Sequence, residues 1–522
     1  MLKSIKSITA LFLICMLLIS ISGCGKTDNS KKQVEVKEER AKTIVMARPV
    51  DSNNLDYVTQ DGNINIWMFN LILEGLVKSS DDGKKVEPNL AETWDVSSDQ
   101  MTYTFHLKKG IKFSDGTLVK GEDWVFSLKR ARDTKDSLWA FSLTAIKDIT
   151  TPDDNTVVIT LNQPWAPIMA DLAMFNASVT SKSYFEKVGE KGFSQKPIGT
   201  GPYAVTEWKK GEYILFNKNP NYWRPGLPKT DQIKVAVVPD DNTRIMQLQA
   251  GDADMITFLP FNRITELQKD SKLTAITLPS TETRYIQMNT TMKPLNDVKV
   301  RQALDLATDK QALMKTILYG FGEPAKSFMA KAGMNWNEGL QTNPYDVEKA
   351  KKLLGEAGYV NGVDLTITVP SGNTVNESVA TMLKEQWSKV GVKLNIETLE
   401  AGLADNKLTT MKSQMQLMIW TNDIVDPSEQ VDYACIFDNS SNFYTGWKND
   451  EVDKLSKDAE KEIDVEKRKV LYYKIQELYQ KDMPMITLFH VPFPVAMKKN
   501  IKGFVQTPLG NYNFENLEKV GK

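Results

Sequence analysis

The alternation of strand and helix patterns over residues 365–396 constrains the fold more than any other feature. Leu365, Ile367 and Val369 alternate with polar residues, which is typical of a β-strand. A helical pattern follows from about residue 376 to residue 390, and a second alternating strand covers residues 392–396. Strand, helix and strand in this order form a βαβ unit with parallel strands. The sequence therefore predicts an α/β fold.

Further helices and strands surround this unit. Apolar residues at Val300 and at three, four and seven positions beyond it indicate an amphipathic helix. Asp309 and Asp346 are placed to cap the two helices that follow. In the first half, the apolar segment 66–76 is predicted to be helical, among mixed strands and helices. We expect two α/β lobes, and ligands tend to bind in a crevice between lobes.

The N-terminal segment has the pattern of an export signal. Lys3 and Lys6 precede an apolar run from Ile8 to Ile21, which is shorter than the roughly 20 residues that span a bilayer. A basic start, a short apolar run and small residues are typical of a secretory signal peptide. We expect residues 1–23 to be removed from the mature protein.

The end of this signal, Ile21-Ser-Gly-Cys24, resembles a bacterial lipoprotein box. The resemblance implies that the thiol of Cys24 accepts the lipid and that Cys24 becomes the first residue of the mature chain. Two acyl chains on one protein give stable membrane anchoring. Residues 25–40 are polar and charged and cannot bury enough surface to fold. We therefore predict a lipidated Cys24 and a flexible tether over residues 24–40.

Composition limits the functions that remain. The chain has 522 residues and a net charge of −1, so it lacks the positive excess typical of nucleic-acid binding. Of its three cysteines, only Cys435 lies beyond the signal and the lipid site, so the body has no internal disulfide. The two histidines, His106 and His490, are far apart in sequence and are expected to be structural. No C-x-x-C, H-E-x-x-H or G-x-S-x-G motif occurs, and we predict no metal, cofactor or catalytic residue.

Motifs along most of the chain resemble the family 5 extracellular solute-binding proteins, the oligopeptide, dipeptide and nickel receptors of ABC importers. The longest is the segment from Phe105 to Arg130, FHLKKGIKFSDGTLVKGEDWVFSLKR. The others follow the family's order: 88–94, 199–203, 219–223, 251–254, 289–303, 345–359 and 420–427. The chain is accordingly identified as a member of this family.

This resemblance implies a two-lobed periplasmic-binding-protein-like fold of type II, cluster C, with a subdomain inserted in the first lobe. Lobe I would consist of residues 41–76, 198–283 and 496–522. The inserted subdomain would be residues 77–197, and lobe II would be residues 284–495. It also implies a monomeric receptor that is not an enzyme. Such a receptor closes over its solute and delivers it to a membrane permease driven by cytoplasmic ATPases, on the extracytoplasmic face of the membrane.

The resemblance also implies a binding residue. Peptide receptors of the family pair the ligand's α-ammonium with an Asp in a W-x-x-D segment, which here is Asp423 after Trp420. A buried carboxylate is costly without a cation, which suits an ammonium supplied by the ligand. Trp420 is expected to line the pocket. Both acids of the segment, Asp423 and Asp426, could instead be turn residues before Pro427.

The sequence departs from the dipeptide receptors at one point. Their Arg for the ligand carboxylate is missing, because residues 369–373 read VPSGN. A longer peptide, held by its backbone, therefore fits better than a dipeptide. A nickel chelate or a sugar remains an alternative cargo in the same transport role. A pheromone-signalling receptor and a surface hydrolase are the alternative classes of function.

Overall fold

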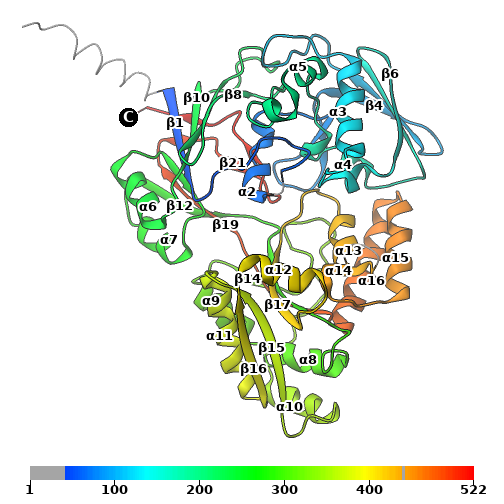
Figure 1. The fold of residues 1–522 in the computed structure, drawn as a ribbon, viewed down its shortest axis with the longest axis vertical. Helices are drawn as coiled ribbons and strands as arrows, with labels where there is room; N and C mark the ends of the chain where they lie inside the picture. The colour runs from blue at the N-terminus through cyan, green and yellow to red at the C-terminus, as the bar shows by residue number, and fades with distance from the viewer. Residues whose placement is uncertain (1–41, 61, 438–440, 522) are drawn as a thin grey trace, which may run out of the picture. The chain divides into compact units, whose positions relative to one another are not determined.

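The structure is a computed structural model, and it describes residues 42–60, 62–437 and 441–521 (Figure 1). The described residues from Ile44 onward form one compact unit, and only residues 42 and 43 of the segment before it are described. The predicted signal peptide, tether and lipidation site at Cys24 therefore lie outside the described residues.

A seven-stranded sheet combines three separate parts of the chain. In spatial order its strands are β12 (Leu273–Leu278), β19 (Phe493–Lys498), β11 (Met255–Thr257), β1 (Thr43–Arg48), β10 (Gln232–Val237), β9 (Tyr213–Lys218) and β8 (Tyr203–Lys209). β1 pairs in parallel with β11, whereas β19 runs antiparallel to both β11 and β12. Strands from the beginning, middle and end of the chain thus share one sheet.

A second sheet, of six strands, contains the predicted βαβ unit. Its order is β14 (Glu323–Pro324), β18 (Met485–His490), β13 (Thr283–Met288), β17 (Met415–Trp420), β15 (Val363–Pro370) and β16 (Val392–Leu399). β15 and β16 pair in parallel along their full length, and α11 (Thr374–Ser388) connects them. This part of the sequence-based prediction is confirmed.

A smaller antiparallel sheet lies within residues 77–197. It consists of β4 (Ala91–Val96), β5 (Thr102–Leu107), β7 (Thr156–Leu161) and β6 (Ile146–Asp153), with α3 (Gly121–Asp133) beside it (Figure 1). The chain crosses between the two large sheets at residues 279–282 and 491–492. β19 thus begins before the lobe boundary predicted between residues 495 and 496. The division into domains otherwise stays a prediction.

Helices and short hairpins complete the described chain. The remaining α-helices are α2 (Asn63–Ile66), α4 (Ile168–Asp171), α5 (Lys182–Phe193), α6 (Asp241–Ala250), α7 (Phe261–Leu267), α8 (Val298–Leu306), α9 (Lys310–Ile317), α10 (Val347–Glu356), α12 (Ala401–Thr409), α13 (Ser428–Cys435), α14 (Ser441–Tyr444), α15 (Asp450–Lys461) and α16 (Val465–Asp482). Short 3-10 helices are η1 (Phe69–Leu71), η2 (Ala140–Leu143) and η3 (Phe175–Ala177). Two-stranded pairs are β2 (Val77–Ser79) with β3 (Val86–Pro88), β20 (Ile501–Lys502) with β23 (Glu518–Lys519), and β21 (Val505–Gln506) with β22 (Tyr512–Asn513).

The predicted helix caps are present. The Asp309 carboxylate accepts the backbone N–H of Ala312 at the start of α9, over 2.9 Å. Asp346 accepts the N–H of Lys349 at the start of α10 over the same distance. Each cap satisfies one of the N–H groups that a first helical turn leaves without an intrahelical partner.

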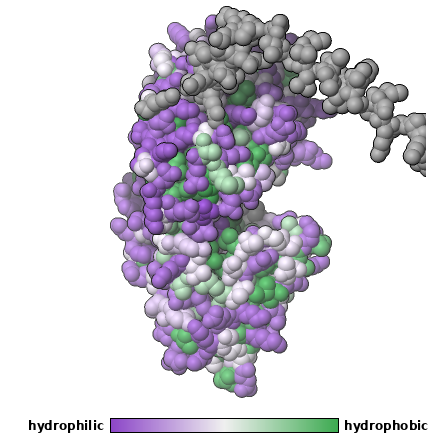
Figure 2. Space-filling view, turned by 90° about the vertical axis from the view of Figure 1, so that its left-hand side faces the viewer, coloured by the Kyte–Doolittle hydropathy of each residue, from purple (hydrophilic) through white to green (hydrophobic). Residues whose placement is uncertain are grey.

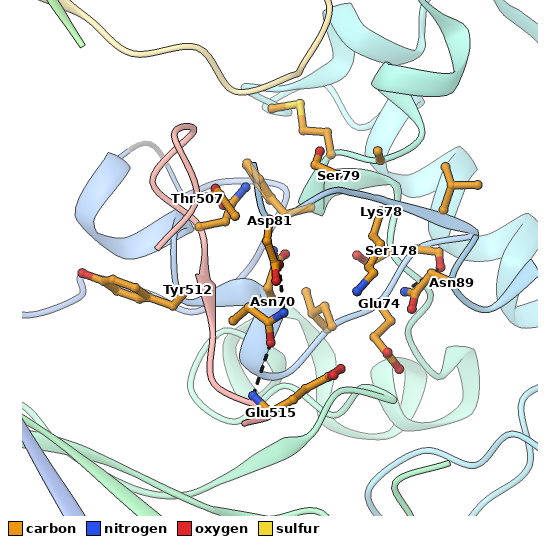
Figure 3. Close-up of a pocket in the computed structure, with 18 of the residues that line it drawn as sticks. Asn70, Glu74, Lys78, Ser79, Asp81, Asn89, Ser178, Thr507, Tyr512 and Glu515 are labelled. Atoms are coloured by element: carbon orange, nitrogen blue, oxygen red, sulfur yellow. Dashed lines mark hydrogen bonds between the residues drawn. The ribbon is translucent and has the colours of Figure 1, made fainter. Parts of the chain in front are cut away.

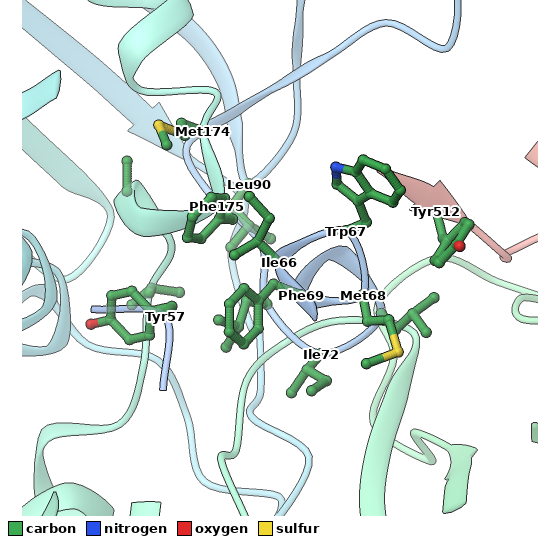
Figure 4. Packing of buried hydrophobic residues seen from close by; sticks show 14 of the residues in the cluster. Tyr57, Ile66, Trp67, Met68, Phe69, Ile72, Leu90, Met174, Phe175 and Tyr512 are labelled. Carbon is green, nitrogen blue, oxygen red and sulfur yellow. The ribbon is translucent and has the colours of Figure 1, made fainter. Parts of the chain in front are cut away.

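The helix predicted over residues 66–76 is wrong. The structure has only the short turns α2 and η1 there. Ile66, Trp67, Phe69 and Ile72 are all buried in the hydrophobic cluster of the first lobe (Figure 4). A segment that is apolar on all sides has no polar face to orient a helix, so the surrounding core decides its conformation.

Each large sheet has its own hydrophobic cluster. The first cluster joins strands of the seven-stranded sheet to the inserted sheet, and the second surrounds the six-stranded sheet, with Trp387 of α11 fully buried in it. The face seen in Figure 2 is largely hydrophilic, with hydrophobic residues in small groups. Within the described part of the chain, no helix has the length and apolar character needed to cross a bilayer.

Candidate ligand-binding site

Asp423 lies in a loop of the second lobe that contacts the first lobe. β17 ends in the six-stranded sheet, and residues 421–427 lead from it into α13. The backbone N–H of Asn422 donates to Thr281 Oγ1, in a crossing segment, over 3.0 Å. The side chain of Ile424 is buried in the cluster of the first lobe. The loop therefore holds Asp423 at the junction of the lobes.

A second carboxyl group contacts Asp423. Glu429 Oε2, in the first turn of α13, accepts the backbone N–H groups of Asp423 at 2.9 Å and Ile424 at 3.3 Å. The side chains of Asp423 and Glu429 are also in hydrogen-bond contact. Glu429 is only 4% exposed, whereas Asp423 is partly exposed. The two residues form an acid pair whose accessible member is Asp423.

No described Lys or Arg forms an ion pair with Asp423 or Glu429. Burial raises the pKa of Asp423 to about 7. Burial and the adjacent Asp423 raise the pKa of Glu429 well above its usual value. Two neighbouring carboxyl groups, one buried and one partly buried, cannot both ionise at low cost. The acid pair is thus a site of negative charge that a cation from outside would stabilise.

An aromatic cluster stands beside the acid pair. The ring centroids of Trp420 lie 4.9 Å from those of both Tyr433 and Phe443. Trp420 is partly exposed, and its Nε1 donates to Asn422 Oδ1 over 3.1 Å. Phe141, from η2 of the inserted subdomain, meets Tyr433 edge-on at 5.6 Å. Aromatic side chains of both lobes therefore meet at this point.

The other acid of the loop, Asp426, is already occupied. Arg468 of α16 donates to both of its carboxylate oxygens, and both side chains are buried. Arg468 also donates to the Tyr472 hydroxyl over 2.9 Å. Asp426 is therefore a structural ion-pair residue rather than a ligand-binding one.

The stretch that lacks the dipeptide receptors' Arg, residues 369–373, comprises the last two residues of β15 and the turn before α11. Asn373 caps α11, because its side chain accepts the N–H of Asn376 over 3.0 Å. Lys407, from α12, lies near the end of the same sheet and pairs with Glu397 of β16. Asn373 caps a helix and Lys407 is paired with Glu397. Neither residue therefore replaces the Arg that binds the ligand carboxylate in the dipeptide receptors.

A large hollow adjoins the crossing segments. Its volume is about 770 Å³, within the range of about 300–1,000 Å³ typical of ligand pockets. Both lobes line it, with Ser280 and Val491 from the crossing segments and Lys331 from the second lobe. An added Cβ at nearby Gly333 would lie 3.8 Å from Thr281 and 4.0 Å from Asn422. Gly333 follows the lining residue Ala332 and thus lies close to the loop of Asp423, but neither Asp423 nor Trp420 lines the hollow itself.

A small cavity in the first lobe is of another kind (Figure 3). It encloses about 60 Å³ beside Glu74, Ser178 and Glu515. A buried water needs about 10–15 Å³ of such volume, so the cavity has room for a few waters. It is too small for a peptide.

The histidines and the cysteine of the body have structural surroundings. His490 Nδ1 lies 2.9 Å from Thr283 Oγ1, and burial lowers its pKa to about 4. His106 Nε2 lies 2.8 Å from Asp95 Oδ2 at the surface. Cys435 is a free, buried thiol. Within the described ranges, no group of three His, Cys, Asp or Glu residues could hold a metal.

Sequence reasoning missed part of this site. Glu429, Tyr433 and Phe443 were not predicted, although the first two share α13 one turn apart. The spacing of Glu429 and Tyr433 could have indicated that both face the same side of a helix. Nothing local could have indicated that this side faces Asp423.

Comparison with known proteins identifies the family over most of the chain. The sequence model of the bacterial extracellular solute-binding proteins, family 5 Middle, matches residues 85–442. The chain is 31% identical over 481 residues to the dipeptide-binding protein of Escherichia coli (strain K12), covering 87% of this chain and 89% of that protein. It is 31% identical over 484 residues to heme-binding protein A of Haemophilus influenzae, covering 87% of each.

Solved structures share the fold. The ABC transporter-associated periplasmic binding protein DppA from Helicobacter pylori, in complex with the peptide STSA, is 28% identical and superimposes with a TM-score of 0.79. The match covers 93% of this chain and 100% of that one. The predicted two-lobed periplasmic-binding-protein fold is confirmed. The chain belongs to the bacterial extracellular solute-binding proteins of family 5.

Proposed function

We propose that this protein is a peptide receptor that captures its ligand between the two lobes and delivers it to an ABC permease. Family 5 proteins bind solutes for ABC importers and are not catalytic. The observation that supports a peptide cargo is the acid pair of Asp423 and Glu429, which has no cationic partner among the described residues. The α-ammonium of a peptide would supply that partner.

The physics of capture favours this arrangement. An isolated buried charge is costly, whereas a charge that meets its partner on binding recovers much of that cost. Closing the lobes around the ligand removes water and strengthens the attraction between ammonium and carboxylate. In this proposal Asp423 binds the ammonium, and Trp420 lines the pocket beside it with Tyr433 and Phe443.

The cargo is proposed to be longer than a dipeptide. Residues 369–373 offer no Arg for a carboxylate at a fixed distance from the ammonium. The hollow of about 770 Å³ supplies space for further residues. Gly333 lies between the lining residue Ala332 and Asn422 of the binding loop, and we propose that a peptide held at Asp423 by its amino end extends past it into the hollow.

We further propose that Cys24 anchors the receptor by a lipid to the extracytoplasmic face of the membrane. The support is the lipoprotein-box pattern of residues 21–24 and the polar tether that follows. Permease and cytoplasmic ATPases would be the partners in transport, and the receptor would act as a monomer.

A porphyrin, a nickel chelate or a sugar is the alternative cargo in the same role. One relative carries the name heme-binding protein A. None of these ligands needs an α-ammonium, so the acid pair favours a peptide over them. A pheromone-signalling role would use the same site, and a surface hydrolase would need catalytic groups that no motif supplies.

The proposal can be tested by replacing the Asp423 carboxylate with an uncharged amide of the same shape. In Asp423→Asn, affinity for a peptide with a free amino terminus should fall by at least about tenfold, as expected for losing a charged hydrogen bond. Affinity for the N-acetylated peptide should change little. Asp364→Asn, at an exposed position of β15, is the matched control. The peptides to titrate are first identified by mass spectrometry of ligand that co-purifies with the protein from residue 25 onward.

Two outcomes would reject the proposal. Equal losses for free and acetylated peptides would remove the ammonium role of Asp423. Co-purification of a single non-peptide molecule, with no binding of any peptide, would remove the peptide cargo while leaving the family and fold unchanged.

A further inference from the structure

Glu429 occupies a position that a simple ammonium site does not require. Its Oε2 accepts two backbone N–H groups of the loop, those of Asp423 and Ile424. Its Oε1 is buried and receives no hydrogen bond from any described donor. The side-chain neighbour of Glu429 is another acceptor group, the carboxyl of Asp423. Two acceptors in contact require a hydrogen atom between them.

The surroundings offer no other way to neutralise the pair. Tyr433, also on α13, is the titratable group that faces both carboxyls, and Asp432 and Tyr444 lie around Tyr433. From the inserted subdomain, the side chain packed against Tyr433 is Phe141, which carries no charge. Within the described part of the chain, the titratable groups that act on the pair and on Tyr433 are therefore acids.

We infer that Glu429 is a positioning residue that stays protonated and donates its O–H to the Asp423 carboxylate. The empty site then carries a single negative charge, which is aimed at one ammonium. Glu429 also holds the loop through its two backbone hydrogen bonds, so it fixes both the place and the orientation of the binding carboxylate. This inference rests on the proposed capture of a peptide ammonium by Asp423.

The burial of the two groups agrees with this division of roles. The pKa of Glu429 is raised more strongly than that of Asp423, which is about 7. Asp423 thus loses its proton first, near neutral pH, and Glu429 keeps its proton. Peptide affinity of the wild type should rise with pH by up to tenfold per unit below about pH 7, and it should fall again above about pH 8, where the peptide α-ammonium loses its proton.

A spectroscopic test does not depend on any ligand. The infrared difference spectrum between the wild type and Glu429→Gln at pH 8 should show the C=O band of a protonated carboxyl in the wild type. Carboxyls elsewhere cancel in the difference. Absence of this band would overturn the inference, even if peptides bind as proposed.

Binding measurements on Glu429 variants distinguish its hydrogen bonds to the loop and to Asp423 from a negative charge on its carboxyl group. Glu429→Leu should lose at least about tenfold in affinity for a free-amino peptide, because it cannot hydrogen-bond to Asp423. Glu429→Gln can accept the backbone N–H groups and donate to Asp423, so it should restore affinity to within about threefold of the wild type. Unfolding temperatures of both variants show whether they are folded.

An ionised Glu429 would give a different result in these measurements. If Glu429 were ionised and supplied a second charge, Glu429→Gln would lose affinity as strongly as Glu429→Leu. If no peptide binds but the infrared band is present, the proposed function fails while the protonated Glu429 stands.

Discussion

Asp426 and Arg468 form a buried ion pair that ties the binding loop to α16. Arg468 Nη2 donates to Asp426 Oδ1 over 2.8 Å, Nη1 donates to Oδ2, and Nε donates to the Ala459 carbonyl over 2.7 Å. The pair anchors the loop that carries Asp423, three residues earlier. It therefore connects the stability of the second lobe to the geometry of the site.

Removing one partner of this pair should be strongly destabilising. Arg468→Met leaves the Asp426 carboxylate buried without a counter-charge, which costs about 3–5 kcal/mol. Urea unfolding should show this loss. Arg263→Met, in the solvent-exposed pair with Glu266, is the control and should cost at most about 1 kcal/mol. Similar losses in both variants would show that burial does not distinguish the two pairs.

Glu74 should make stability depend on pH. Burial raises its pKa to about 7, although Trp223 Nε1 donates to its carboxylate. Because the folded-state pKa lies above the unfolded one, the folded protein binds the proton more tightly, and the stability from this group is lost as pH rises from about 4.5 to 7. The difference between the ordinary pKa of about 4.5 and the folded-state pKa of about 7 corresponds to about 3 kcal/mol.

Glu74→Gln removes this titration and keeps an acceptor for Trp223. Relative to the wild type, the variant should gain about 3 kcal/mol in unfolding free energy between pH 4.5 and pH 8. Glu348→Gln, on the surface, should show no such gain. Parallel pH profiles for wild type and Glu74→Gln would contradict the prediction.

The contact between Phe141 and Tyr433 should favour the closed form. It joins the inserted subdomain to α13 edge-on at 5.6 Å. An aromatic pair contributes about 0.5–1.5 kcal/mol, so Phe141→Ala should weaken ligand binding by about 2- to 12-fold in calorimetric titration. Phe126→Ala breaks the pair with Phe185 within the inserted subdomain and should leave affinity unchanged. Unchanged affinity in Phe141→Ala would mean that the contact plays no part in closure.

Cys24 should decide where the protein resides in a bacterial host. Cys24→Ala removes the thiol that would accept the lipid, so the protein should no longer incorporate a labelled fatty acid and should leave the membrane fraction. Cys435→Ala, at the buried free thiol, is the control and should remain membrane-bound. Continued labelling of Cys24→Ala would place the lipid on another residue, and absence of labelling in the unchanged protein would exclude lipidation.

The local order of the chain could be predicted from its sequence. The βαβ unit of β15, α11 and β16 and the caps at Asp309 and Asp346 all follow from patterns within a few residues. The periodic spacing of apolar side chains and the capping of helix ends depend on residues within the same short range. Both can therefore be recognised in the sequence. The family motifs also predicted the two-lobed fold and indicated Asp423 and Trp420 as candidate binding residues.

The partners of those residues came only from the tertiary structure. Glu429, which contacts Asp423, lies on the helix after the loop, and Arg468, which pairs with Asp426, lies on α16. Phe141, which packs against Tyr433, comes from the other lobe. The seven-stranded sheet likewise joins β1 and β19 around β11. Whether a carboxyl is free to bind a ligand depends on which groups surround it in space. Those groups are set by long-range packing, which no local periodicity encodes.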